Sequence, residues 1–396
     1  MSAPKPLVVG RVRLARVCRV TNPVAFRARS PISISMDIEL RRDLMVMTRL
    51  LASTVAATAF VAVTAAPAQA AVNDPLYDKQ WGLQQIRAER AWAISTGSNV
   101  VIAVVDTGVD LRHPDLQSKL VPGATFVDCG PASCGNGDWR GPDGEPDAGD
   151  EHGTHVAGIA AAATGNGAGV AGVAPDAKIM PIKVLEAGSG SFADIAAGIR
   201  YAADHGAQVV NLSLGALPGS QALTLVGLES DVTEAIVYAQ TKGVAVIAAA
   251  GNETAPLCDT PAWEPGALCV TATDRNELKA WYSNLGVKAD LKAVAAPGGA
   301  GLVNCDDDVW SSVPTGTGAA ACGQGDYDAY AGTSMATPHV SGVAALLFAQ
   351  GRSLDNVYSV LMSTARTPVV GLRGVYTPAY GWGIVDAQAA VAAPRT

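Results

Sequence analysis

The sequence predicts an α/β fold in which a doubly wound, mostly parallel β-sheet carries helices on both faces. Short, continuous apolar runs recur along the chain, and such runs are typical of strands that are buried on both faces. Helix-length segments separate several of these runs, and two of the segments end at glycine, a common residue just past a helix C-terminus. Alternation of this kind indicates a parallel sheet.

The predicted elements follow one another without a visible linker or internal repeat. The predicted strands are residues 99–106, 177–185, 208–215, 243–252 and 291–298. The predicted helices are residues 153–163, 191–206 and 229–243. The stretch 128–150, which is rich in Gly, Pro and Asp, is a predicted loop, and the stretch 298–328 is another. Residues 71–396 are therefore expected to form a single domain.

The segment from Met47 to Ala70 has the pattern of a secretory signal peptide. Arg49 precedes an apolar run that starts at Leu50, and the run ends in Ala68-Gln69-Ala70, which fits the A-x-A cleavage pattern. A transmembrane anchor is the alternative, but the run is only about 17 residues long and ends in small residues. We expect cleavage after Ala70, secretion to the extracellular space and no membrane anchor.

Residues 1–46 lie upstream of this signal and are rich in arginine. Met36, Met45 and Met47 are alternative starts for translation. The stretch is expected to be either an over-long start of the reading frame or an extended n-region of the signal peptide.

The chain that remains after residue 70 is acidic. Residues 1–70 hold 10 of the 28 Lys and Arg residues and 3 of the 36 Asp and Glu residues, which leaves 18 basic and 33 acidic residues and a net charge of −15. A surface of this charge repels nucleic acids and anionic membranes. It is compatible with solubility outside the cell and with cation binding.

Six of the seven cysteines lie in the predicted domain, and an even count in a secreted chain favours disulfides. Six cysteines allow 15 pairings. Pairing between sequence neighbours costs the least loop-closure entropy. The expected pairs are Cys129–Cys134, Cys258–Cys269 and Cys305–Cys322. A zinc site is the alternative, but no C-x-x-C spacing is present.

Reactive side chains occur where predicted strands end and predicted helices begin. Asp106, Ser213 and Asn252 end or follow apolar runs, whereas His152 and Ser334 stand at helix starts. In open α/β sheets, ligands bind at the carboxyl ends of the strands. The sequence therefore predicts a carboxylate, an imidazole and a hydroxyl at one sheet edge, the three groups that an Asp–His–Ser relay needs.

Four motifs in this region carry a family resemblance. In chain order they are VVDTGVDLRHPDL, HGTHVAG, AAGN and GTSMATPHVSG. Together they resemble the motifs of the subtilisin-like serine proteases, including the order Asp, His, Ser. The match extends from about Tyr77 to Val391, and its first part, NDPLYDKQWGLQQIRAERAW, resembles thermitase-type members. The resemblance implies a subtilisin-like fold and a catalytic triad of Asp106, His152 and Ser334.

The two histidines of HGTH have different implied roles. The resemblance makes His152 the base that takes the proton of Ser334, with Asp106 orienting its ring. His155 is expected to be a packed structural histidine. A metal site is the alternative for such a pair, but the familiar zinc motif has H-E-x-x-H, and here Gly153 and Thr154 stand between the histidines.

The resemblance also implies the groups that bind the substrate. Asn252, together with the backbone N–H of Ser334, would stabilise the oxyanion. Ser213, Leu214 and Gly215 would form a strand that pairs with an extended peptide, and main-chain pairing implies broad specificity. Glu253 either borders the first specificity pocket, where it would favour basic or polar residues, or is a solvated acid.

Calcium is the cofactor that the resemblance implies. An all-oxygen site with flexible geometry suits this ion in a structural role. The implied ligands are the side chains of Asp74, Asp115 and Asn166 and the carbonyls of Thr164, Ala168 and Val170. A second cluster of acids is either another calcium site or a solvated loop, and it consists of Asp138, Asp143, Asp147 and Asp150.

The sequence thus predicts a secreted, monomeric serine endopeptidase that cleaves polypeptides through an acyl-enzyme. Two alternatives remain: a catalytically silent binding protein with the subtilisin fold, and a calcium-binding structural module, which explains the acids but not the triad. Because the signal ends at Ala70 and the family match is visible by Asp74, we expect no pro-domain and folding without an intramolecular chaperone.

Overall fold

The computed structural model describes residues 72–129, 132–216, 230–302, 304–319 and 321–395. The arginine-rich stretch 1–46 and the predicted signal peptide 47–70 lie outside these residues. Within them, none of the helices combines the length and the apolar character that a membrane crossing requires.

The centre of the domain is a seven-stranded parallel sheet. Its strands are β1 (Val101–Asp106), β2 (Ala124–Thr125), β3 (Lys178–Lys183), β4 (Val209–Leu212), β5 (Ala245–Ala249), β6 (Leu268–Thr273) and β7 (Ala293–Pro297). The order across the sheet is β2-β3-β1-β4-β5-β6-β7, so strands that follow β1 in the chain lie on both sides of it. The predicted doubly wound sheet is confirmed. Strands β2 and β6 are additional to the five predicted runs.

The helices lie before, between and after the strands along the chain. The three predicted helices correspond to α4 (His152–Ala161), α5 (Phe192–Asp204) and α7 (Ser230–Thr241). The remaining α-helices are α2 (Trp81–Gln85), α3 (Ala88–Trp92), α8 (Thr333–Phe348), α9 (Leu354–Thr364) and α10 (Ala387–Ala392). Three short 3-10 helices are η2 (Tyr77–Lys79), η3 (Gln117–Lys119) and η4 (Cys305–Asp307).

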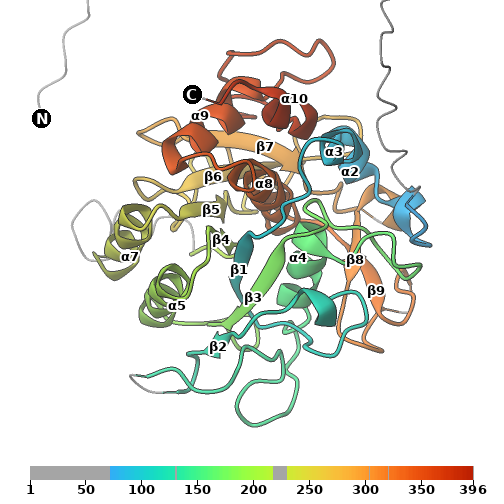
Figure 1. Ribbon diagram of the computed structural model, residues 1–396, viewed down its shortest axis with the longest axis vertical. Helices are drawn as coiled ribbons and strands as arrows, with labels where there is room; N and C mark the ends of the chain where they lie inside the picture. Colours follow the sequence, from blue (N-terminus) through green and yellow to red (C-terminus); the bar gives the residue numbers. More distant parts are fainter. Residues whose placement is uncertain (1–71, 130–131, 217–229, 303, 320, 396) are drawn as a thin grey trace, which may run out of the picture. The chain divides into compact units, whose positions relative to one another are not determined.

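Strand residues alternate between two hydrophobic cores, one on each face of the sheet. Ile102 and Val104 of β1 belong to the core that also contains residues of α4 and α8. Ala103 and Val105 belong to the core formed with α5 and α7, which lie together on the other face (Figure 1). Since both faces are covered, the strands are apolar throughout, which is why they read as continuous runs in the sequence.

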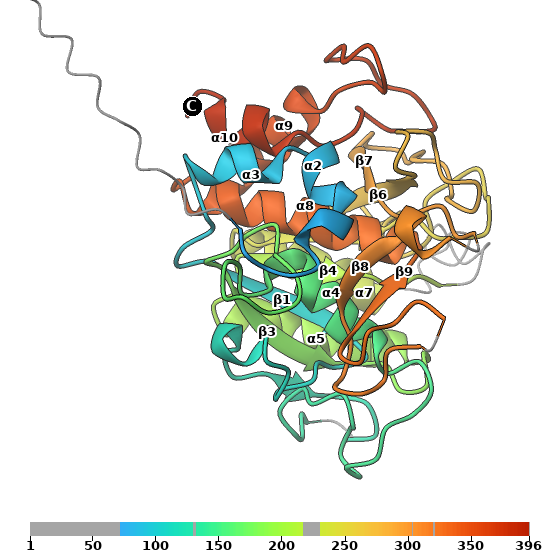
Figure 2. The same cartoon turned by 90° about the vertical axis from the view of Figure 1, so that its right-hand side faces the viewer.

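Helix α8 runs through the larger core and carries a candidate catalytic residue at its start. Figure 2 shows it in front of the sheet, between α2 and β4. Nearly all of its side chains are buried, and they are mostly small, so α8 approaches its neighbours closely. A Cβ added to Gly342 would lie 2.5 Å from the Cβ of Val173. Ser334, in the first turn, is half-buried and faces the edge of the core.

The prediction of a loop over residues 298–328 is partly wrong. Within it, η4 and β8 (Val309–Ser312) are regular, and β8 pairs antiparallel with β9 (Tyr327–Tyr330). Tertiary packing decides this outcome, because Val309 and Trp310 are buried beside α4 although glycine-rich segments surround them. The other predicted loop, 128–150, contains no helix and no named strand in its described residues.

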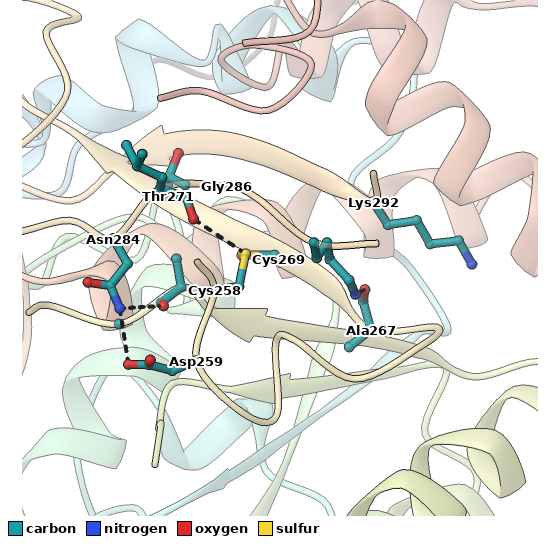
Figure 3. Close-up of a disulfide and its surroundings, with 12 residues drawn as sticks. Cys258, Asp259, Ala267, Cys269, Thr271, Asn284, Gly286 and Lys292 are labelled. Atoms are coloured by element: carbon teal, nitrogen blue, oxygen red, sulfur yellow. Dashed lines mark hydrogen bonds between the residues drawn. A yellow bond between two sulfur atoms is a disulfide. The ribbon is translucent and has the colours of Figure 1, made fainter. Parts of the chain in front are cut away.

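All three expected disulfides are present, joining Cys129 to Cys134, Cys258 to Cys269 and Cys305 to Cys322. The second of these is fully buried and links the segment before β6 to β6 itself (Figure 3). The zinc alternative for these six cysteines is therefore excluded.

Candidate active site

The predicted reactive side chains lie at the carboxyl edge of the sheet. Asp106 is the last residue of β1, and Asn252 lies three residues after β5. His152 begins α4, and Ser334 lies in the first turn of α8. Because all seven strands are parallel, every one of these termini falls at the same edge.

Asp106 and His152 are in direct contact. The carboxylate oxygen Oδ1 lies 2.7 Å from Nδ1 of the imidazole and also accepts the N–H of Thr107 at 2.8 Å. Oδ2 is buried and has no hydrogen-bond partner in the described part of the chain. Burial lowers the pKa of His152, but the charge of Asp106 and its hydrogen bond outweigh that effect, so the pKa of the imidazole is raised.

Hydrogen bonds through Thr107 fix the start of α4 against β1. Its hydroxyl donates to the carbonyl of Asp150 at 2.8 Å and accepts the N–H of Gly153 at 2.9 Å. Gly153 allows this approach, because a Cβ there would lie 2.2 Å from the carbonyl oxygen of Gly108. The backbone before and after His152, at Asp150 and Gly153, is thus fixed to Thr107, and this positions the imidazole.

Behind this pair lies a fully buried cation, Lys183, which pairs with Asp106 in the β1–β3 register. Its Nζ donates to Asp150 Oδ2 at 2.8 Å and to the carbonyls of Thr107 at 3.0 Å and Trp139 at 3.3 Å. An ammonium buried in this way is tolerated only with such partners. Lys183 therefore ties the loop before His152 to the strand that carries Asp106.

The acid cluster expected in the loop 128–150 differs from the prediction. Asp138 bonds to Arg140, and Asp143 caps the N–H of Glu145. The acids that gather are Asp147, Asp150 and Glu186. Lys183 forms ion pairs with two of the three, Asp150 and Glu186. A fully buried ammonium thus already supplies positive charge there.

Ser334 lies next to the predicted substrate strand. Its hydroxyl donates to the carbonyl of Ser213 at 3.1 Å and is therefore not hydrogen-bonded to His152 in this conformation. The hydroxyl of Ser213 in turn donates to the carbonyl of Ser334 at 2.8 Å. A buried amide and hydroxyl, Asn211 and Ser341, continue this hydrogen-bond chain and join the end of β4 to α8.

Asn252 is held in one orientation by the residue before Ser334. Its Oδ1 accepts both the backbone N–H of Thr333 at 2.9 Å and the hydroxyl of Thr333 at 3.0 Å. The amide Nδ2 makes no hydrogen bond within the described residues, and Asn252 is an exposed residue. A hydrogen-bond donor next to the hydroxyl of Ser334 is thus available to a ligand.

A cleft of about 740 Å³ adjoins these groups. His152, Ser213, Leu214, Gly215 and Glu253 contribute to its wall. One part is apolar and is lined by Leu185, Phe192, Ile195 and Val232. The carboxylate of Glu253 is exposed and bonds to the side-chain amide of Asn284 at 2.9 Å. The predicted substrate strand and His152 thus line the same cleft.

His155 lies away from this edge. It is completely buried, stacks on Tyr330 with 4.4 Å between ring centres, and bonds through Nε2 to the carbonyl of Asp328 at 3.2 Å. Burial lowers its pKa to about 3, so the ring is neutral. No other metal-ligating side chain is grouped with it in the described residues, and the metal alternative for the histidine pair receives no support.

The residues implied as calcium ligands lie around the loop 163–170. Asp74 is 5% exposed and accepts the N–H groups of Gly165, Asn166 and Gly167 at 2.8, 3.0 and 3.3 Å. Asp115 is fully buried and accepts Asn166 Nδ2 at 2.7 Å and the N–H of Val170 at 3.0 Å. Burial raises the pKa of Asp115. The Oδ1 atom of Asn166 accepts the N–H of Ala168 at 2.8 Å, and the hydroxyl of Thr164 that of Gly172 at 3.1 Å.

Two residues near the candidate active site, Lys183 and Asn284, were not identified from the sequence. Lys183 carries a signal, because a lysine inside an apolar strand run needs a buried partner. Asn284 carries none, since a single asparagine in a turn is common.

Comparison with known proteins gives a consistent result. The model of the family described as Peptidase_S8, Subtilase family, matches residues 97–383. Thermitase of Thermoactinomyces vulgaris is 43% identical over 295 residues, which cover 74% of this chain and 91% of that protein. Subtilisin Savinase of Lederbergia lenta is 38% identical over 313 residues, which cover 78% and 97% of the two chains.

A solved structure of a protease from Pseudoalteromonas arctica PAMC 21717 is also similar. It superposes with a TM-score of 0.67 at 34% sequence identity, and the match covers 81% of this chain and 98% of the other.

The Lys183–Asp150 pair gives a prediction about stability. Lys183→Met leaves Asp150 buried without its cation, so the free energy of unfolding at neutral pH should fall by about 3–5 kcal/mol. Denaturant unfolding followed by circular dichroism measures the loss. Lys178→Met is the matched control, because Lys178 lies on the same strand but is exposed, and its change should stay within about 0.5 kcal/mol. Equal losses in the two variants would show that the buried pair contributes nothing specific.

Proposed function

The chain belongs to the subtilase family, and on that premise we propose that it is a secreted serine endopeptidase whose catalytic groups are Ser334, His152 and Asp106. The observation that carries the assignment is the 2.7 Å hydrogen bond between the buried carboxylate of Asp106 and Nδ1 of His152. This bond fixes the ring so that its other nitrogen is the one available as a base. The substrates are polypeptides, which is the class that peptidases of this family cleave.

The reaction proceeds in two stages. The Ser334 hydroxyl turns from the carbonyl of Ser213 toward His152, gives its proton to Nε2, and forms a bond to the peptide carbonyl carbon. The tetrahedral intermediate collapses as the C–N bond breaks and His152 returns the proton to the leaving amine. Water, activated by the same imidazole, then releases the acyl group from Ser334. The carboxylate of Asp106, bonded to Nδ1, stabilises the imidazolium that forms.

The oxyanion is stabilised by two donors. Asn252 is exposed, its Nδ2 has no hydrogen-bond partner in the described part of the chain, and Thr333 holds the opposite end of that amide. The backbone N–H of Ser334, in the first turn of α8, is the second donor, and the helix dipole favours negative charge at this end. Each donor acts where the charge develops and needs no reorganisation.

The substrate lies along Ser213, Leu214 and Gly215, which line the cleft. An extended peptide pairs with this backbone as an added strand. Main-chain pairing makes the enzyme broadly specific, and the apolar part of the cleft accepts hydrophobic side chains of the substrate.

Secretion follows from the predicted signal peptide at residues 47–70. Two further features fit an extracellular protein: the acidic net charge after residue 70 and three disulfides.

The residues around the loop 163–170 fit a structural calcium ion. Asp74 and Asp115 are buried, and neither forms an ion pair with a Lys or Arg among the described residues. Burying two carboxylates without a counter-charge is unfavourable, and a cation relieves this. We infer that their carboxylates, the side chain of Asn166 and the carbonyls of Thr164, Ala168 and Val170 hold calcium, which would then cross-link the N-terminal segment to the domain.

The first prediction of this proposal separates the enzyme from a silent protein of the same fold. A fluorophosphonate should label Ser334, and Ser334→Ala should abolish both labelling and casein hydrolysis, because the nucleophile is removed without disturbing the core. Mass spectrometry locates the label, and thermal melting checks that the variant is folded. Hydrolysis at the parent rate by folded Ser334→Ala would contradict the assignment.

The two histidines are matched controls in the same assay. His152→Gln should remove labelling, whereas His155→Gln should retain it and lose mainly stability, because His155 is a buried packing residue. The opposite pattern would mean that the wrong histidine has been assigned.

The pH dependence has a defined sign. The imidazole acts in its neutral form, so kcat/KM falls as the pH drops through the pKa of His152. Asp106 raises that pKa, so Asp106→Asn should move the acid limb of the profile to lower pH and reduce kcat about 10⁴-fold. A fluorogenic peptide measures the profile. Asp143→Asn, an exposed acid of the preceding loop, is the control and should change neither quantity. An acid limb that stays in place in Asp106→Asn would contradict the pairing.

The calcium proposal predicts a loss of stability in chelator. An ion that binds only the folded state at a thousandfold excess over its Kd stabilises it by about 4 kcal/mol, so the melting temperature of inactive Ser334→Ala protein should fall in EGTA. The shift should shrink in Asp74→Asn and Asp115→Asn but persist in Asp147→Asn, which tests the other acid cluster. Identical melting curves in calcium and in chelator would contradict the calcium proposal.

A further inference from the structure

Asn284 lies in the connection between β6 and β7, yet its side chain points at another part of the molecule. It is completely buried. Figure 3 shows its amide directed toward Asp259, in the segment that follows β5. This segment, residues 250–259, carries Asn252 and is called the oxyanion loop below.

One side of the Asn284 amide binds the loop just after Asn252. Oδ1 accepts the backbone N–H of Glu253 at 3.0 Å and that of Ala255 at 2.7 Å. These two donors belong to irregular backbone, which has no ladder partner of its own, so the amide replaces the hydrogen bonds that a strand would supply.

The other side binds the loop before Asn252 and at its far end. Nδ2 donates to the carbonyl of Ala250 at 3.0 Å, to Glu253 Oε2 at 2.9 Å and to Asp259 Oδ2 at 3.1 Å. The backbone N–H of Asn284 donates to the carbonyl of Gly251 at 3.0 Å. An NH₂ group has two hydrogens, so three acceptors share them. Within the described residues, every hydrogen bond of this side chain is thus directed to the oxyanion loop.

Gly251, immediately before Asn252, is pressed against this amide. Its φ of +104° is one that residues with a side chain rarely adopt. An added Cβ would lie 2.3 Å from Asn284 Nδ2 and 2.1 Å from Asp259 Oδ2. The backbone directly before Asn252 is therefore restricted in conformation, and the side chain of Asn284 packs against it.

The end of the loop is covalently anchored as well. Asp259 directly follows Cys258, whose disulfide to Cys269 attaches it to β6 (Figure 3). The acceptor at the far end of the network is thus fixed independently of Asn284.

We propose that Asn284 is a positioning residue for the oxyanion hole: it sets the backbone of Asn252 so that Nδ2 points to the carbonyl oxygen of the substrate. It acts on the reaction through the position of Asn252 and makes no contact with the substrate itself. This inference rests on the proposed function, in which Asn252 stabilises the oxyanion.

The test is a double-mutant cycle on kcat with a chromogenic peptide substrate. Asn284→Ala should lower kcat at least about tenfold and change KM less than about threefold, because a misplaced donor weakens transition-state binding rather than substrate binding. In the Asn252→Ala background, Asn284→Ala should lower kcat less than about twofold, since there is no donor left to misplace. Asn284→Asp, which keeps the Oδ1 acceptor and loses the NH₂ donor, is the second variant if Asn284→Ala fails to fold.

A matched control separates positioning from stability. Tyr358 is buried, and its hydroxyl bonds to both backbone groups of Val246 in β5, the strand that leads into the oxyanion loop. Tyr358→Phe should lower the melting temperature and leave kcat within about twofold of the parent value.

The outcomes distinguish two failures. If Asn252→Ala alone leaves kcat unchanged, the proposed role of Asn252 is wrong and the inference about Asn284 falls with it. If Asn252→Ala lowers kcat but the Asn284 variants lower it by the same factor in both backgrounds, only the inference about Asn284 is wrong.

Discussion

The parallel alignment of β1 with β3 and β4 is the constraint on which the rest of this structure depends. It places Asp106 opposite Lys183 and brings the ends of all strands to one edge of the sheet. Helices can then return to the same edge and begin there, as α4 and α8 do. Asp106, His152 and Ser334 are far apart in the sequence of this subtilase-family serine peptidase, and the sheet together with the starts of α4 and α8 brings them to one edge.

Much of this arrangement could be predicted, because burial on both faces of the sheet produces a recognisable pattern of apolar residues in the sequence. Strands covered on both faces have to be apolar without interruption, which located β1, β3, β4, β5 and β7. Chemistry at strand ends then identified Asp106 and Asn252, and cysteine spacing gave the disulfides. The contact between Asp106 and His152 was also foreseen, although only the structure reveals that the hydroxyl of Ser334 rests on the carbonyl of Ser213.

What escaped prediction depends on contacts between distant segments. The β8–β9 hairpin exists because its residues pack on α4, and its own sequence is too short and too rich in flanking glycine to indicate a strand. Glu186 joins Asp147 and Asp150 only because β3 ends beside the loop that carries them. No sequence pattern identifies Asn284, because its role depends on backbone N–H groups of a loop that is distant in the sequence.

The two hydrogen bonds from Thr333 to Asn252 determine which end of the Asn252 amide is exposed. The two ends of a carboxamide are nearly equal in size, so shape cannot tell them apart, but only the oxygen can accept from Thr333. The polarity of the exposed end is therefore dictated chemically and not sterically. A rotated amide would present a lone pair to the proposed oxyanion and repel it, and the two donors of Thr333, directly before the proposed nucleophile, disfavour that orientation.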